Sequence, residues 1–207
     1  MIKKSLKAFV VLVALVLTVA CSKNDVPELG KQYSQLPADL SQYNLSPVTE
    51  IFSLTCGHCR NMEQMIPEIE KQINQEVGKV HVTFNQSAQV AALIYYSAVM
   101  QLDGKPDEAL LESLFATVQM QDVTMSEQQQ AIEEAFTSRN LKSPYKMDET
   151  EFKELNKLVT IADRVTKDGQ INSVPTFIVG GKYQIITEGH ESIEDLAKTM
   201  NYLLTQN

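Results

Sequence analysis

The chain is poor in the residues that build metal centres, with three cysteines and three histidines among 207 residues. Cys56 and Cys59 stand together in one Cys-Gly-His-Cys tetrad, and no second cysteine pair is present. A structural zinc site takes four ligands, and only His81 and His190 remain outside the tetrad, so the composition argues against zinc. Covalent haem attachment needs a histidine directly after the second cysteine, where this chain has Arg60. We therefore expect no metal and no organic cofactor.

The N-terminal apolar stretch is too short to span a membrane comfortably. Residues 8–20 are apolar apart from Thr18, whereas a membrane-spanning helix needs about 20 apolar residues. Residues 1–7 carry three lysines and no acidic residue. A basic segment followed by a short apolar one is typical of a cleaved secretory signal, which we place at residues 1–20.

The third cysteine, Cys21, directly follows the predicted signal. Residues 17–21 resemble a bacterial lipoprotein cleavage box, which predicts that Cys21 is lipidated. Thr18 stands where such boxes usually carry leucine, so ordinary cleavage at the same place is the alternative. Either route takes the protein out of the cytoplasm, to a compartment in which disulfides persist. We expect a periplasmic protein, anchored to a membrane only if Cys21 carries a lipid.

Positive charge is scarce. Lysine and arginine number 18 against 26 aspartates and glutamates, for a net charge of -8. Loss of the predicted signal removes three lysines and no acidic residue, which lowers the net charge to -11. Such an acidic surface disfavours nucleic acid and anionic lipid as partners, because both are negatively charged. Its simplest consequence is solubility.

The first third of the chain changes from polar to patterned. Residues 21–45 are polar and punctuated by prolines, so we expect a tether with at most one short edge strand. Residues 46–85 predict a strand, helix, strand unit. Val48–Leu54 is mostly apolar, a helix follows as far as Ile73 with a kink at Pro67, and Lys79–Phe84 alternates between apolar and polar side chains.

The remainder is helical and then mixed. Residues 86–170 show helical periodicity, with predicted capping boxes at Ser126 with Gln129 and at Asp148 with Glu151. In residues 171–207, two glycines join strands at 176–179 and 182–186, and a last helix follows at 192–204. An α/β domain interrupted by a helical insertion accounts for this order, because neither sheet fragment could bury its faces alone.

The tetrad after a strand, the Val174-Pro175 pair before another, and the helical segment between them resemble the DsbA family of thioredoxin-fold thiol:disulfide oxidoreductases. The resemblance runs from about residue 30 to residue 204. It implies an α/β protein with a thioredoxin-like fold, built from residues 46–85 and 171–207, and an all-helical domain inserted at 86–170. Gly57 departs from the best-known members, which carry proline, and Gly-His is the dipeptide of protein disulfide isomerase. The redox poise therefore stays open.

The resemblance implies a redox-active disulfide between Cys56 and Cys59. Cys56 would be the nucleophile, because unpaired amides at a helix start stabilise its thiolate. His58 would donate to the Cys56 sulfur or add positive charge, and Cys59, one turn later, would resolve mixed disulfides. A stabilised reduced form makes the disulfide a stronger oxidant. A purely structural disulfide is a poor alternative, because so short a loop constrains the unfolded chain little.

The resemblance also implies roles outside the tetrad. Pro175 would be a cis proline facing the disulfide, and Val174 would hold an extended substrate peptide by strand-like pairing. Thioredoxin-like reductases and disulfide isomerases often have threonine before this proline, so Val174 favours an oxidase. Glu50 and Lys79 match a charged pair beneath the active site, which would tune thiol pKa values or move protons for Cys59.

Each of these charged residues also has a simpler interpretation. Glu50 could lie at a sheet edge and reach water, and Lys79 could be a solvated lysine at a strand start. We expect His81 and His190 to be ordinary surface or packing residues.

These observations predict an exported, monomeric oxidoreductase that introduces disulfides into unfolded or reduced exported proteins. A DsbB-like membrane quinone oxidoreductase would reoxidise it. A reductase or isomerase of the same fold is the nearest alternative because of Gly57, although such isomerases usually dimerise through an N-terminal domain and this chain has only a short tether. A peptide-binding or copper-delivery module is an alternative of another class. Replacing Cys56 by serine distinguishes an oxidase from such a module, because a module that only binds peptides should keep its binding activity, whereas an oxidase should lose all turnover.

Overall fold

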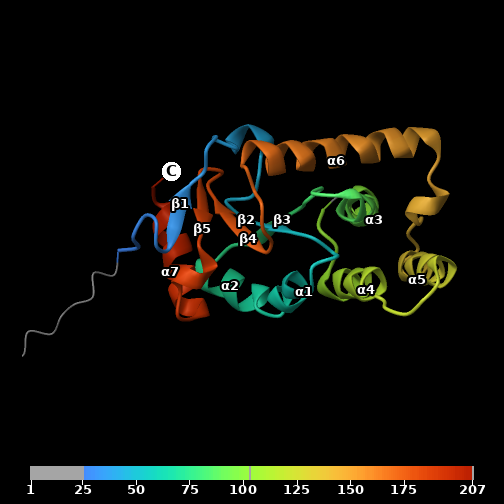
Figure 1. The fold of residues 1–207 in the computed structure, drawn as a ribbon, viewed down its shortest axis with the longest axis horizontal. Coiled ribbons are helices and arrows are strands. Elements are labelled where there is room, and N and C mark those ends of the chain that lie inside the picture. The colour runs from blue at the N-terminus through green and yellow to red at the C-terminus, as the bar shows by residue number, and fades with distance from the viewer. Residues whose placement is uncertain (1–25, 103, 207) are drawn as a thin grey trace, which may run out of the picture.

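The computed structural model describes residues 26–102 and 104–206, which contain one five-stranded mixed sheet (Figure 1). The predicted signal and Cys21 lie outside the described residues. The strand order is β1-β5-β4-β2-β3, in which β2 and β3 are parallel and the other neighbours are antiparallel. The strands are β1 (Tyr33–Gln35), β2 (Val48–Phe52), β3 (Val77–His81), β4 (Thr176–Val179) and β5 (Tyr183–Ile185).

The unit from β2 to β3 carries the tetrad at its first junction. All five residues of β2 are buried, as its apolar sequence predicts, and helix α1 (Gly57–Glu63) begins within the tetrad. The predicted kink at Pro67 is instead a break, with a separate helix α2 (Ile66–Ile73) in which the proline lies in the first turn. Proline fits there because the first amides of a helix have no partner within it. Strand β3 starts at Val77, two residues before the predicted start, and ends at His81.

Four helices form the insertion between β3 and β4: α3 (Gln86–Leu102), α4 (Glu108–Val118), α5 (Met125–Thr137) and α6 (Glu149–Asp168). The capping box predicted at Asp148 with Glu151 is confirmed at the start of α6. The box predicted at Ser126 is wrong: Thr124 and Glu127 exchange the capping bonds at α5, two residues earlier. Both pairs have three-residue spacing, so the pattern alone left the register ambiguous.

The C-terminal segment completes the sheet. Gly180 and Gly181 turn the chain between β4 and β5 with φ of 59° and 67°, in the left-handed region that glycine enters freely. A Cβ at Gly181 would also lie 2.9 Å from the backbone nitrogen of Ser41. Helix α7 (Ile193–Leu204) follows and packs beside α2.

The segment predicted as a tether is only partly one. Strand β1 pairs with β5, and the side chains of Leu36 and Leu40 are buried in the core. The short edge strand expected within residues 21–45 is therefore confirmed as β1, whereas the residues after it, through Leu36 and Leu40, belong to the packed domain and not to a tether. The apolar residues that anchor this segment are single leucines among polar neighbours, which gives no periodic signal.

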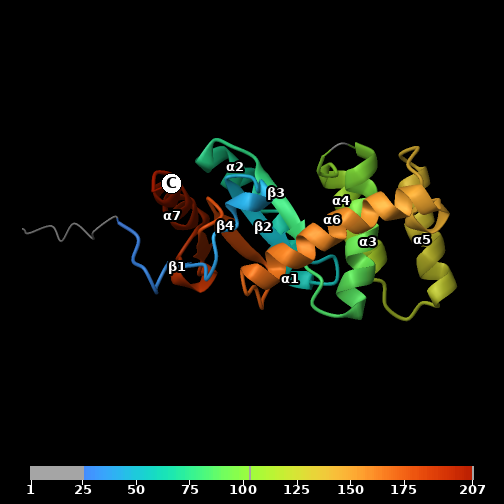
Figure 2. The same ribbon diagram turned by 90° about the horizontal axis from the view of Figure 1, so that it is seen from above.

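Two apolar cores lie on the two faces of the sheet. Helices α2 and α7 cover one face, where Val48, Val77 and Phe177 are buried. The larger core joins the other face to the helical insertion, and α6 runs from the insertion back across the sheet (Figures 1 and 2). Phe52 and Phe115 meet in this core with ring centroids 5.9 Å apart. No helix in the described part of the chain is long and apolar enough to cross a membrane.

Candidate active site

The two cysteines of the tetrad are thiols with different surroundings. Cys56 is half-buried and is the N-cap residue of α1, where its sulfur accepts a hydrogen bond from the Cys59 backbone N–H at 3.1 Å. Cys59 is fully buried. A three-residue turn separates Cys56 from the end of β2, so the buried strand leads to a first sulfur at the surface and a second one beneath it.

The pKa values of the two thiols move in opposite directions. A hydrogen bond from the Cys59 thiol is the largest effect on Cys56, and with the amides of Cys59 and His58 it outweighs burial and lowers the pKa of Cys56 to about 6. The same hydrogen bond, together with burial, raises the pKa of Cys59 well above its usual range. A thiolate at Cys56 and a thiol at Cys59 is the arrangement a reversible disulfide centre needs.

His58 lowers the pKa of Cys56 less than its place in the tetrad suggested. Its side chain is exposed, and among the described residues its ring makes no hydrogen bond to the Cys56 sulfur. The backbone amide and the charge of His58 both help to lower the pKa of Cys56. Of the two roles expected for this ring, the structure supports the electrostatic one.

Val174, the residue before Pro175, lies against the first sulfur. The peptide bond between Val174 and Pro175 is cis, as the resemblance implied. The Val174 carbonyl oxygen lies 3.6 Å from the Cys56 sulfur and can accept a weak hydrogen bond when that thiol is protonated. These two residues come from the loop before β4, which pairs with β2, so the sheet brings them to the tetrad across more than a hundred residues of chain.

Beneath the tetrad, Glu50 and Lys79 are paired and buried. Lys79 Nζ donates to Glu50 Oε2 at 2.5 Å and to Glu63 Oε1 at 2.6 Å, and the Lys79 and Glu50 side chains are 3% and 0% exposed. The sheet register places Glu50 opposite Lys79 on the parallel strands β2 and β3. The structure thus contradicts the simpler interpretation of both residues as solvated. Sequence reasoning missed Glu63, although it follows Cys59 by one helical turn.

Two carboxylates share one ammonium in this cluster. Burial, with a smaller contribution from Glu63, outweighs the opposing effect of Lys79 and raises the pKa of Glu50 to about 8. Burial acts to lower the pKa of Lys79, but the two carboxylates outweigh it. The second oxygen of Glu50 is buried and has no hydrogen-bond partner among the described residues, and this loss of solvation disfavours the charged form. Glu50 can therefore hold or release a proton in the buried layer that contains Cys59.

The turn before the tetrad is held by two further side chains that sequence reasoning missed. The Leu54 N–H donates to His81 Nε2 and the Leu54 carbonyl accepts from Gln119 Nε2, each at 2.8 Å. His81, expected at the surface or in packing, is fully buried and hydrogen-bonded. His190 is half-buried and hydrogen-bonds Ile186 and Thr199, remote in sequence from this turn.

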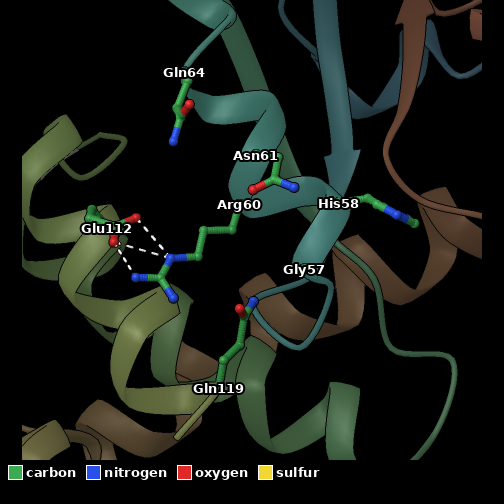
Figure 3. Close-up of a pocket in the computed structure, with 7 residues that line it drawn as sticks. All are labelled: Gly57, His58, Arg60, Asn61, Gln64, Glu112 and Gln119. Atoms are coloured by element: carbon green, nitrogen blue, oxygen red, sulfur yellow. Dashed lines mark hydrogen bonds and ion pairs between the residues drawn. The ribbon is translucent and has the colours of Figure 1, made fainter.

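A polar pocket of about 670 Å³ opens beside α1 (Figure 3). Arg60 spans it and makes a forked ion pair with Glu112 of α4, both of whose oxygens lie 3.1 Å from Nε. The pair ties the active-site helix to the helical insertion. Within the described ranges, no three histidine, cysteine, aspartate or glutamate side chains converge to hold a metal ion. The pocket is lined by Gly57, His58, Arg60, Asn61, Gln64, Glu112 and Gln119.

Comparison with known proteins agrees with this geometry. A family model described as Thioredoxin matches residues 45–201. Thiol:disulfide interchange protein DsbA of Escherichia coli strain K12 is 27% identical over 209 residues, which cover 95% of this chain and 97% of that protein. The protein of the same name from Dickeya dadantii strain 3937 is 26% identical and covers 97% and 99%.

Solved structures show the same architecture. DsbA from Xylella fastidiosa has a TM-score of 0.66 at 18% identity, covering 87% of this chain and 97% of that one. DsbA from Proteus mirabilis has a TM-score of 0.61 at 21% identity, covering 88% and 97%. This likeness confirms the predicted thioredoxin-like fold with inserted helices. The chain therefore belongs to the thioredoxin family, as one of its DsbA-like thiol:disulfide oxidoreductases.

Proposed function

We propose that this protein oxidises cysteine pairs in exported proteins through a disulfide between Cys56 and Cys59. The observation that carries the proposal is the unequal acidity of the two thiols, with the pKa of Cys56 at about 6 and that of Cys59 raised. When reduction of a disulfide leaves a stabilised thiolate, as at Cys56, that disulfide accepts electrons readily from ordinary thiols.

The reaction transfers two electrons in two steps. A client thiolate attacks the Cys56 sulfur of the oxidised protein, the bond between the two active-site sulfurs breaks, and the Cys59 sulfur leaves with the electron pair and takes up a proton. A second client thiolate then attacks the client sulfur of the mixed disulfide and releases the Cys56 thiolate. The client gains a disulfide, and the protein ends as a dithiol.

The buried Glu50 supports the first step as a proton donor. Its pKa of about 8 lets it hold a proton at neutral pH, and when it is ionised its charge adds to the effects that raise the pKa of Cys59. In this role Glu50 would pass a proton toward the departing Cys59 sulfur, and Lys79 would stabilise the carboxylate left behind. In the reverse direction, Glu50 would accept the proton that Cys59 loses when the disulfide reforms.

The cis Val174–Pro175 segment would hold the client. Its carbonyl already contacts the Cys56 sulfur, so an extended peptide pairing with Val174 would lie across the reacting atoms. Reoxidation would come from a DsbB-like membrane quinone oxidoreductase. The predicted export signal at residues 1–20 supports a monomeric periplasmic protein, which would carry a lipid anchor only if Cys21 is lipidated.

A reductase or isomerase is the second candidate, favoured by Gly57, which stands where DsbA-like oxidases usually carry proline. The two directions differ in reduction potential, which equilibration of the purified protein with glutathione buffers measures. A value near about -120 mV, as for DsbA, supports the oxidase, whereas one near about -270 mV, as for thioredoxin, supports the reductase.

A direct test mixes the oxidised protein with a reduced, unfolded client and follows the client's thiols. We expect stoichiometric client oxidation by the native protein and none by the Cys56→Ser variant. Client aggregation, measured in parallel, distinguishes an oxidase from a binding module. A binding module would protect the client from aggregation equally well with and without Cys56. Unchanged client thiols in the presence of the oxidised native protein would contradict the oxidase.

A further inference from the structure

The peptide unit around Leu54 is held by side chains instead of by backbone partners. Its N–H donates to His81 Nε2 and its C=O accepts from Gln119 Nε2, both at 2.8 Å. Leu54 lies after the end of β2 and is separated from Cys56 by one residue. The geometry of the turn therefore depends on a residue of β3 and on a residue at the end of α4.

The ring of His81 is fixed in one orientation and one tautomer. Its Nδ1 lies 2.7 Å from the Val82 carbonyl oxygen, which can only accept, while the Leu54 N–H can only donate. The ring is therefore neutral with its proton on Nδ1. Burial lowers the pKa of His81 to about 4, which keeps the acceptor at Nε2 available at neutral pH. Phe52 and Tyr95 pack on the ring, with centroids 5.1 and 6.1 Å from it.

Gln119 reaches the turn from the helical insertion. It is the C-cap residue of α4, and its own N–H is bonded to Phe115 within that helix. The Arg60–Glu112 pair fastens α4 to α1 close by, and Gln119 lines the same pocket (Figure 3). The insertion thus contacts both the helix that carries the tetrad and the turn that leads into it.

We propose that His81 and Gln119 are positioning residues that hold the Leu54 peptide, and through it the Cys56 sulfur, in the geometry used for thiol exchange. Cys56 closes the turn by donating its N–H to the Ser53 carbonyl at 3.0 Å, and its sulfur accepts the Cys59 N–H at 3.1 Å. A rotation at Leu54 moves both bonds, and hydrogen bonds weaken steeply as they lengthen or bend. Loss of either support should therefore weaken the stabilisation of the Cys56 thiolate.

The proposal rests on the proposed function, but its test needs no client. The ultraviolet absorbance of the thiolate in the reduced, full-length mature protein is followed against pH for Gln119→Ala and for the control Gln129→Ala. Gln129 is an exposed glutamine of the same insertion, and within the part of the chain that the structure describes its side chain bonds only Glu133. We expect Gln119→Ala to raise the midpoint of Cys56 ionisation by about half a pH unit or more, a roughly threefold change in the ionisation constant, and the control to leave it unchanged.

His81 provides a rescue test. His81→Leu removes the acceptor, whereas His81→Gln offers an amide oxygen at a similar reach, so we expect the first to raise the midpoint and the second to restore most of it. If His81→Leu fails to fold, Gln119→Ala decides alone. Variants that lower the unfolding midpoint yet leave the Cys56 titration unchanged would overturn the proposal and show a structural role only. A shifted titration in a protein that oxidises no client would instead count against the proposed function.

Discussion

The stabilised Cys56 thiolate should contribute stability to the reduced protein that grows as the pH rises. The pKa of Cys56 is about 6 in the folded protein and 9.0 for an ordinary thiol, so the folded state binds fewer protons between these values. Stability from this group is fully present above about pH 9 and is lost as the pH falls through about 6. Replacing Cys56 by serine, which does not ionise in this range, should abolish the effect.

The magnitude follows from the two pKa values. At about pH 8 such a thiol contributes roughly 2.7 kcal/mol and at about pH 5 close to nothing. Cys56 is only half-buried, so solvent screening reduces the expected difference to about 1–2 kcal/mol. The destabilisation caused by Cys56→Ser should therefore be larger at about pH 8 than at about pH 5 by this amount.

Urea unfolding of the reduced proteins at the two pH values measures the difference. Comparing each variant with the native protein at the same pH cancels the contribution of Glu50, which titrates in the same window. Cys59→Ser serves as the control, because its hydroxyl can still donate to the Cys56 sulfur and should retain most of the pH dependence. Equal destabilisation by Cys56→Ser at both pH values would refute the reasoning.

Three further predictions follow from burial and capping. Glu50 has its pKa raised to about 8 from 4.5, so the stability that this one group contributes falls as the pH rises through this window, opposite to the contribution of Cys56. Glu50→Gln should remove this contribution, on the order of 3 kcal/mol between about pH 5 and pH 8, and parallel curves for the two proteins would be contrary evidence. Thr124→Ala should lower the free energy of unfolding by about 1 kcal/mol and Ser126→Ala by only a few tenths, and the reverse order would restore the predicted box. Phe115→Ala removes a fully buried side chain from the larger core and should lower the free energy of unfolding in urea by about 3–5 kcal/mol. A decrease below about 1 kcal/mol would show that this core does not join the sheet to the helical insertion.

The parts of the fold that were predictable carry local signals. A pattern of a few residues was enough to predict the apolar strand before the tetrad, the capping pair at Asp148 and the turn at the paired glycines before β5. Pro67 shows the limit of such signals, because proline both kinks a helix and begins one, and the choice depends on packing.

The candidate site was predictable only where a motif or a family resemblance named the residue. Glu63 and His81 were not identified from the sequence: Glu63, at the end of α1, accepts a hydrogen bond from Lys79 of β3, and His81 meets Leu54 through the register of β2 and β3. Gln119 is 65 residues from Leu54 in the chain. Contacts of this kind depend on tertiary placement, which periodicity does not encode.

The central claim is that the fold makes Cys56 an unusually acidic thiol, and the thiolate absorbance of the reduced native protein between about pH 4 and pH 10 tests it most directly. The account predicts a transition centred near pH 6 that disappears in Cys56→Ser and persists in Cys59→Ser. A single transition near pH 9, where an ordinary thiol ionises, would contradict it.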